Sequence, residues 1–122
     1  YIYTTAAPAL VACALRAALA VIRDDHARRR HLHALIAHFR AGARALPWRL
    51  PPPHTAIQPL VVGASAEAVA LSEQLATHGV WVPAIRPPTV PANTARLRIS
   101  LSAAHTAADV DALLVALRAC AP

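Results

Sequence analysis

The sequence contains no lysine, and each of its 12 basic residues is an arginine. A chain without lysine cannot form a Schiff base through a lysine amine. An all-arginine cation set suits the planar, bidentate recognition of carboxylate or phosphate groups. The richness in alanine, arginine and proline equally matches the codon bias of a GC-rich genome. The formal net charge of +6 therefore does not by itself define a ligand.

Aromatic residues, cysteines and glycines are also scarce. Aromatic residues make up 4% of a sequence that is 57% hydrophobic, so the core must consist of alanine, leucine, valine and isoleucine. The two cysteines, Cys13 and Cys120, lie far apart and predict neither a metal site nor a disulfide framework, and we expect a reduced, cytoplasmic protein. The three glycines are too scattered for a phosphate-binding loop, and no nucleotide-binding or G-x-S-x-G motif occurs.

The longest apolar run is AAPALVACALRAALAVI, residues 6–22. A membrane span needs about 20 strongly apolar residues and disfavours a central arginine such as Arg16. A signal peptide requires a basic segment before its apolar stretch, and no basic segment precedes this run. We therefore expect a well-buried helix from Pro8 to about Arg23. The length of 122 residues is typical of one domain, and because the sequence begins at Tyr1 we expect it to start within a longer protein.

The rest of the chain alternates helical and extended patterns. Asp24 and Asp25 can cap a helix whose apolar residues recur at i, i+3, i+4 and i+7. Pro59 inside an extended run predicts an edge strand or a bulge. The expected helices are 25–45, 65–78 and one from Thr106 onward, and the expected strands are 57–62, 80–85 and 95–101. This order predicts an α+β fold, with an antiparallel or mixed sheet of about three strands and helices packed on one side.

The second helix carries four histidines and a run of three arginines, which suggest a metal or nucleic-acid site. His31 and His33 point to nearly opposite helix faces, and His31 and His38 are about 10 Å apart along the axis. One metal ion cannot bind these pairs. No aromatic stacking platform accompanies the arginines. We therefore expect solvated side chains, no metal and no nucleic-acid partner.

The segment IRPPTVPANTARLRI, residues 85–99, combines three arginines with three prolines. Prolines restrict the backbone of the loop. In the strand that follows, alternation places Arg96, Arg98 and Ser100 on one face. A rigid element that presents guanidinium groups favours bidentate binding of a carboxylate. The alternative is that these arginines only form surface ion pairs.

The segment AIRPPTVPANTARLRISLSAAHT resembles the C-terminal segment of the α-oxoamine synthases, and YIYTTAAP, LRAALAVIRDD, HFRAG and AIQPLVVG extend the likeness over nearly the whole chain. This family consists of homodimeric enzymes that depend on pyridoxal 5′-phosphate (PLP) and have the aspartate-aminotransferase fold. The resemblance implies that residues 1–122 form a single C-terminal small domain of a larger enzyme. Residues 1–7 then lead in from the junction with its large domain.

The motif RPPTVP is most similar to the corresponding segment of one branch of this family. That branch condenses L-alanine with a pimeloyl thioester, with loss of CO2, in biotin biosynthesis. Whether the acyl group arrives as pimeloyl-CoA or on a carrier protein stays open. The alternatives are a sister branch, of the 5-aminolevulinate synthase or glycine C-acetyltransferase type, and a non-catalytic domain that binds a small ligand. No membrane partner is expected.

The resemblance also implies roles for single residues. It implies that Arg98 grips the amino-acid carboxylate, that Thr89 contacts the substrate, and that Arg86 steers the acyl substrate. Thr4 and Thr5 match hydroxyls that reach the cofactor phosphate of the neighbouring subunit. The Schiff-base lysine is expected upstream, so this chain holds no catalytic residue and is expected to be inactive and free of PLP on its own. Two residues carry no such role: Arg96 is expected to be structural, and Asn93 stands where the family often has glycine.

Overall fold

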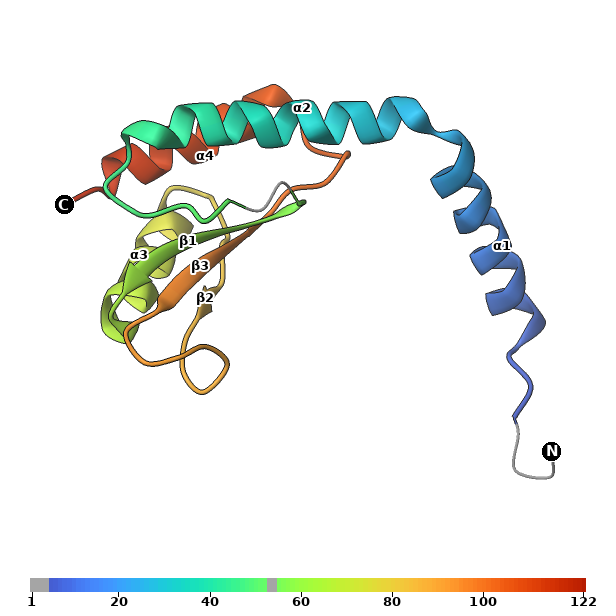
Figure 1. The fold of residues 1–122 in the computed structure, drawn as a ribbon, viewed down its shortest axis with the longest axis horizontal. Helices are drawn as coiled ribbons and strands as arrows, with labels where there is room; N and C mark the ends of the chain where they lie inside the picture. Colours follow the sequence, from blue (N-terminus) through green and yellow to red (C-terminus); the bar gives the residue numbers. More distant parts are fainter. Residues whose placement is uncertain (1–4, 53–54) are drawn as a thin grey trace.

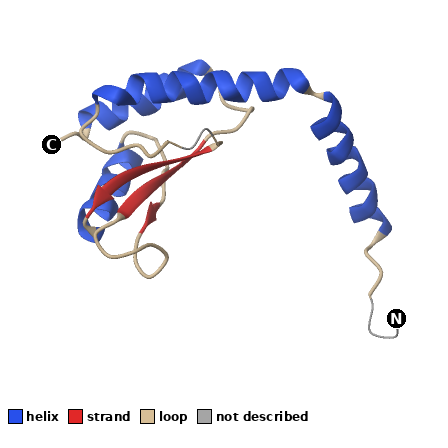
Figure 2. Cartoon of the chain, in the orientation of Figure 1, coloured by secondary structure: helices blue, strands red, loops and turns tan. Residues whose placement is uncertain are grey.

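The computed structural model describes residues 5–52 and 55–122. Three helices and a small sheet form a body, and one further helix projects away from it (Figure 1; Figure 2). In chain order, the elements are α1 (Ala9–Asp24), α2 (His26–Gly42), the 3-10 turn η1 (Ala43–Ala45), β1 (Ile57–Gly63), α3 (Ser65–Thr77), β2 (Ala84–Ile85), β3 (Ala95–Ser100) and α4 (Ala107–Ala119).

The sheet is antiparallel, with the strand order β1-β3-β2. Pro59 lies on β1, an edge strand, as predicted, and it faces Arg98 of β3 in the register. A proline is tolerated there because an edge strand has one side without a ladder partner. The pairing slips between Val61 and Gly63, where β1 ends. The predicted strand 80–85 is shorter than expected, since only Ala84 and Ile85 pair with β3.

The core lies on one face of the sheet. Alternate residues of β3 are buried, among them Leu97 and Ile99, and the residues between them are exposed or half-buried. The buried cluster joins this face to apolar residues of α2, α3 and α4, including Leu35, Ile36, Phe39, Leu71, Leu75, Val110, Leu114 and Leu117. The α+β class, with helices on one side of a three-stranded sheet, is confirmed.

Local sequence signals explain where the elements begin and end. The Asp25 carboxylate accepts the Arg28 backbone N–H at 2.8 Å, which caps α2 and lowers the pKa of Asp25. Thr106 and Asp109 form the reciprocal capping box at the start of α4. Gly79, after α3, and Asn93, in the β2–β3 loop, both adopt a positive φ. At the start of α3, Ala64 takes the cap position and Ser65 is the first helical residue, so no side chain caps this helix.

A helix was predicted from Pro8 to about Arg23, and α1 (Ala9–Asp24) confirms it. The prediction that this helix is well buried is wrong, because none of its residues is buried. The chain turns at Asp25, which has a non-helical backbone, and α1 leaves the body there (Figure 1). The apolar pattern of α1 shows that this helix needs a partner surface, but it does not show that the residues that follow it supply that surface.

Candidate functional site

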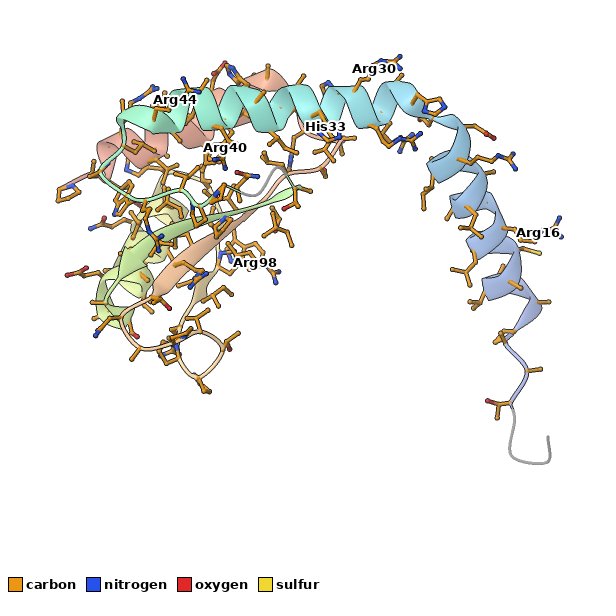
Figure 3. All side chains as sticks on the ribbon, viewed as in Figure 1. Arg16, Arg30, His33, Arg40, Arg44 and Arg98 are labelled. Carbon is orange, nitrogen blue, oxygen red and sulfur yellow. The ribbon has the colours of Figure 1, made fainter. Side chains whose placement is uncertain are left out.

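Arg98 lies on β3, the strand of the sheet that is paired on both sides. β3 is the central strand, and the Arg98 backbone N–H donates to the Pro83 carbonyl at 3.0 Å on one side, while Pro59 faces Arg98 on the other. The side chain is exposed on the face opposite the core and projects toward the side of the molecule on which α1 lies (Figure 3). Within residues 5–52 and 55–122, its guanidinium has no hydrogen bond or ion pair.

Arg96, two residues earlier on the same face, is half-buried and differs in its contacts. Its Nε donates to the Thr94 carbonyl at 3.0 Å, so the side chain is tied to the end of its own loop. Arg98 therefore has a guanidinium available for a ligand, whereas the Arg96 guanidinium already serves the structure. This difference agrees with the structural role expected for Arg96.

Arg86 and Thr89 lie in the loop that joins β2 to β3. The Thr89 N–H donates to the Arg86 carbonyl at 3.1 Å, which closes a turn across the cis Pro87–Pro88 bond, and both side chains are exposed. Arg98 bonds to Pro83, three residues before Arg86, so the two arginines are about 10 Å apart along the strand direction. The structure thus places Arg86 and Thr89 together and Arg98 further along the same hairpin.

The two threonines expected at a cofactor phosphate lie at the start of the chain. Thr5 is exposed and precedes α1, at the far end of the projecting helix (Figure 1). Thr4 lies outside the described residues. A helix of 16 residues is about 24 Å long. The structure therefore does not bring Thr5 to Arg98.

The histidines of α2 are exposed, and two of them also bind other segments. His38 Nε2 donates to the Asp111 carboxylate of α4 at 2.6 Å, and His31 Nε2 donates to the His105 carbonyl at 2.9 Å. These bonds tie α2 to the α4 end of the body. In the part of the chain that the structure describes, no three His, Cys, Asp or Glu side chains are placed to hold a metal ion. Nor is any described helix long and apolar enough to cross a bilayer.

The site thus consists of an exposed arginine, without a hydrogen-bond partner in the described part of the chain, on an antiparallel hairpin of a small α+β body. The family model for aminotransferase class I and II matches residues 1–117. The chain belongs to this family. Among solved members with similar structures, a Sphingomonas wittichii serine palmitoyltransferase is 27% identical and superposes on 97% of this chain and 30% of its own, with a TM-score of 0.88. A second structure, titled SPT with PLP, is also 27% identical. It covers 98% of this chain and 31% of its own chain, with a TM-score of 0.90.

Curated relatives in this aminotransferase family are more similar in sequence. The 8-amino-7-oxononanoate synthase of Methylobacillus flagellatus is 63% identical over 93% of this chain and 29% of its own length. The synthase of the same name from Burkholderia thailandensis is 59% identical over 96% of this chain and 30% of its own length. The chain therefore spans about 30% of the length of the curated relatives it matches. A Francisella tularensis structure of that name, at 24% identity and a TM-score of 0.78, supports the fold.

The residues of this aminotransferase-family chain lack the group that would hold PLP covalently. With no lysine in the sequence, no lysine of this chain can bond to the cofactor aldehyde. Two cavities of the body, of about 310 and 620 Å³, include Trp81 and Asp109 in one lining and Trp48 and Glu67 in the other, and Arg98 lines neither. Arg98 lies instead on an open face. The described residues therefore present an exposed arginine that could bind an anionic group, without the enclosure of a complete active site.

Sequence reasoning missed a polar network that joins α2 to β1 and to Pro51 and Thr55. Arg40 of α2 donates to the Gln58 side-chain oxygen at 2.7 Å and to the Pro51 carbonyl at 3.0 Å. Gln58, which is fully buried, donates to the Thr55 carbonyl at 2.6 Å. The signal in the sequence is a single glutamine within the apolar run IQPLVV. A buried amide requires hydrogen-bond partners.

Proposed function

We propose that residues 1–122 are the C-terminal small domain of a longer, PLP-dependent 8-amino-7-oxononanoate synthase. Such an enzyme joins the Cα of L-alanine to the acyl carbon of a pimeloyl thioester, releasing the thiol and CO2. The observation that carries the proposal is the 57–63% identity to eight relatives of that name over 93–97% of the chain. Each of these eight relatives carries the name of this branch, which favours it over a sister synthase.

In this proposal, Arg98 binds the carboxylate of L-alanine. A guanidinium presents two parallel N–H donors that match the two oxygens of a carboxylate. Because the backbone of Arg98 is held in the central strand, the bound amino acid would have a fixed orientation. A fixed orientation lowers the barrier by holding the bond to be broken in its reactive geometry. When bound, PLP supplies the electron sink for this chemistry.

The remaining residues receive supporting roles. We assign Thr89 to a hydrogen bond with the substrate and Arg86, its neighbour in the turn, to attraction of the acyl thioester, whether pimeloyl-CoA or a pimeloyl carrier protein. Thr4 and Thr5 are assigned to the cofactor phosphate of the second subunit of a homodimer, since hydroxyl groups donate well to phosphate oxygens. Thr5 is exposed beyond α1, away from the body of its own chain, which supports such a role.

The test uses the longer enzyme and its Arg98→Ala variant. L-alanine is titrated while the absorbance of the cofactor is followed, and the dissociation constant is measured. Losing a charge-assisted bidentate contact should raise that constant about 10- to 100-fold. Arg96→Ala is the matched control, because Arg96 is on the same strand face and its guanidinium is bound to Thr94. It should leave L-alanine binding within about threefold of the parent.

An unchanged dissociation constant in Arg98→Ala would remove Arg98 from the carboxylate role. A longer enzyme that condenses glycine or L-serine in preference to L-alanine would instead assign it to a sister synthase. The 122-residue chain alone, mixed with PLP and dialysed, should retain no visible absorbance and show no activity, since it has no lysine. A retained absorbance band would contradict the proposed division of the site.

A further inference from the structure

The α1 apolar face comprises six large side chains of that helix and is exposed along its whole length. Leu15, Leu19 and Ile22 are 58%, 62% and 63% exposed. At 100° per residue, the six residues cover about half of the helix circumference. The face consists of Leu10, Val11, Leu15, Leu19, Val21 and Ile22. Contiguous apolar surface of this kind marks an interaction site.

We propose that the α1 apolar face docks against the part of the longer chain outside residues 1–122, and that α1 thereby fixes the position of Arg98 relative to that part. The inference deepens the proposed function and rests on it. A second copy of this chain is the competing occupant. The domain boundary then falls near Asp25, where α1 leaves the body, and not at residue 7 as the sequence suggested.

The first support for this occupant is the pose of α1. No residue of α1 is buried against the body, and a helix of this length has marginal stability when isolated in water. Yet solved relatives superpose on 97% and 98% of this chain, a coverage that must include most of α1. In those structures this chain corresponds to only 30% and 31% of the polypeptide. A helix that has this pose in those structures without contacts in its own segment requires contacts from the remainder.

The second support is the direction in which the face points. Figure 3 shows Arg16 on the side of α1 that faces away from the sheet. The centre of the α1 apolar face lies about 140° around the helix from Arg16, so the face is turned toward the sheet side. Arg98 projects toward that same space (Figure 3). If one part of the longer chain filled this space, it would cover α1 and close the open face around Arg98.

Cysteine labelling of the longer enzyme tests the docking directly. Leu15→Cys and Arg16→Cys are made in a Cys13→Ser background, and the rate of alkylation is measured by peptide mass spectrometry in the native and guanidinium-unfolded states. Leu15→Cys should react at least about tenfold more slowly in the native state, because it becomes reactive only on local opening. Arg16→Cys, on the outer side of the same turn, should react at nearly the unfolded rate.

Photo-crosslinking then identifies the occupant. With p-benzoylphenylalanine in place of Leu19, irradiation of the longer enzyme should give a product of monomer mass, crosslinked to peptides outside residues 1–122. A product of dimer mass would overturn the proposal in favour of a second copy. Rapid labelling of Leu15→Cys would overturn it as well. If either of these two results is found in an enzyme that still condenses L-alanine, the docking is rejected and the proposed function stands. If Leu15→Cys is protected in a protein that does not condense L-alanine, the proposed function is rejected and the docking stands.

Discussion

The polar side chains of this chain differ in whether they have hydrogen-bond partners within it. Those with partners stabilise the fold, and those without are available to a ligand. Arg40, Arg96 and Gln58 bind carbonyl or amide groups of their own chain. Arg98 is exposed and has no such partner among the described residues. The alternation in ARLRIS predicted that Arg98 faces away from the core, because a strand has a period of two. It could not predict the Arg40–Gln58 bond, which joins segments 18 residues apart.

That network yields a stability prediction. Gln58→Leu should lower the free energy of unfolding by about 1–3 kcal/mol, because it removes a buried amide that binds Arg40 and Thr55. Arg40→Met should have an effect of similar size, and a double-mutant cycle should show coupling of about 1 kcal/mol or more. The measurement is urea denaturation followed by tryptophan fluorescence. Arg44→Met, an exposed position on η1, is the control, and additive effects would show that the two side chains are energetically independent.

At the scale of elements, helix ends were predicted better than burial. The capping residues Asp25 and Thr106 act through their immediate neighbours, so local sequence is sufficient to find them. The length of β2 depends on where its partner β3 runs, and Val80 and Trp81 do not join the ladder. The exposure of α1 depends on the whole fold. The periodicity of a helix shows which face needs cover, and only the arrangement of the other elements shows whether the cover is present.

The cap of α4 predicts how stability changes with pH. The Asp109 carboxylate accepts the Thr106 N–H at 2.7 Å and its hydroxyl at 2.8 Å, and these bonds hold the pKa of Asp109 below its ordinary value of 3.8. A lowered pKa favours the ionised form in the folded state. The stabilisation is therefore complete above pH 3.8 and is lost as the pH falls through the folded-state pKa.

Asp109→Asn keeps an acceptor at the cap but has no titratable charge. It should be less stable than the parent at neutral pH, and the difference should shrink as the pH falls below 3.8. Urea denaturation at neutral and at acidic pH measures both values. The control Glu73→Gln changes an exposed carboxylate of α3 that has no hydrogen-bond partner in the described part of the chain. A difference that stays constant across this range would show that the Asp109 charge does not contribute to the cap.

At the scale of the whole molecule, the chain is a packed body with one projecting helix, and the two parts differ in how far their apolar residues are buried. The body buries a cluster of apolar residues against one sheet face. Helix α1 carries apolar residues that the body does not cover. The free arginine of the candidate site lies on the open face between them (Figure 3). The chain spans about 30% of the length of these curated relatives.

The independence of the body from α1 can be measured by deleting residues 1–22, which leaves Asp25 in place to cap α2. Because no residue of α1 is buried, the free energy of unfolding should stay within about 0.5 kcal/mol of the full 122-residue chain. The half-buried Trp48 remains as a fluorescent probe of the body. Leu117→Ala, at a fully buried position of α4, should cost about 2–5 kcal/mol and shows that the assay detects core damage. A loss of more than about 2 kcal/mol on deletion would mean that α1 belongs to the cooperative core, and the domain boundary would then have to move from Asp25 to a position before Ala9.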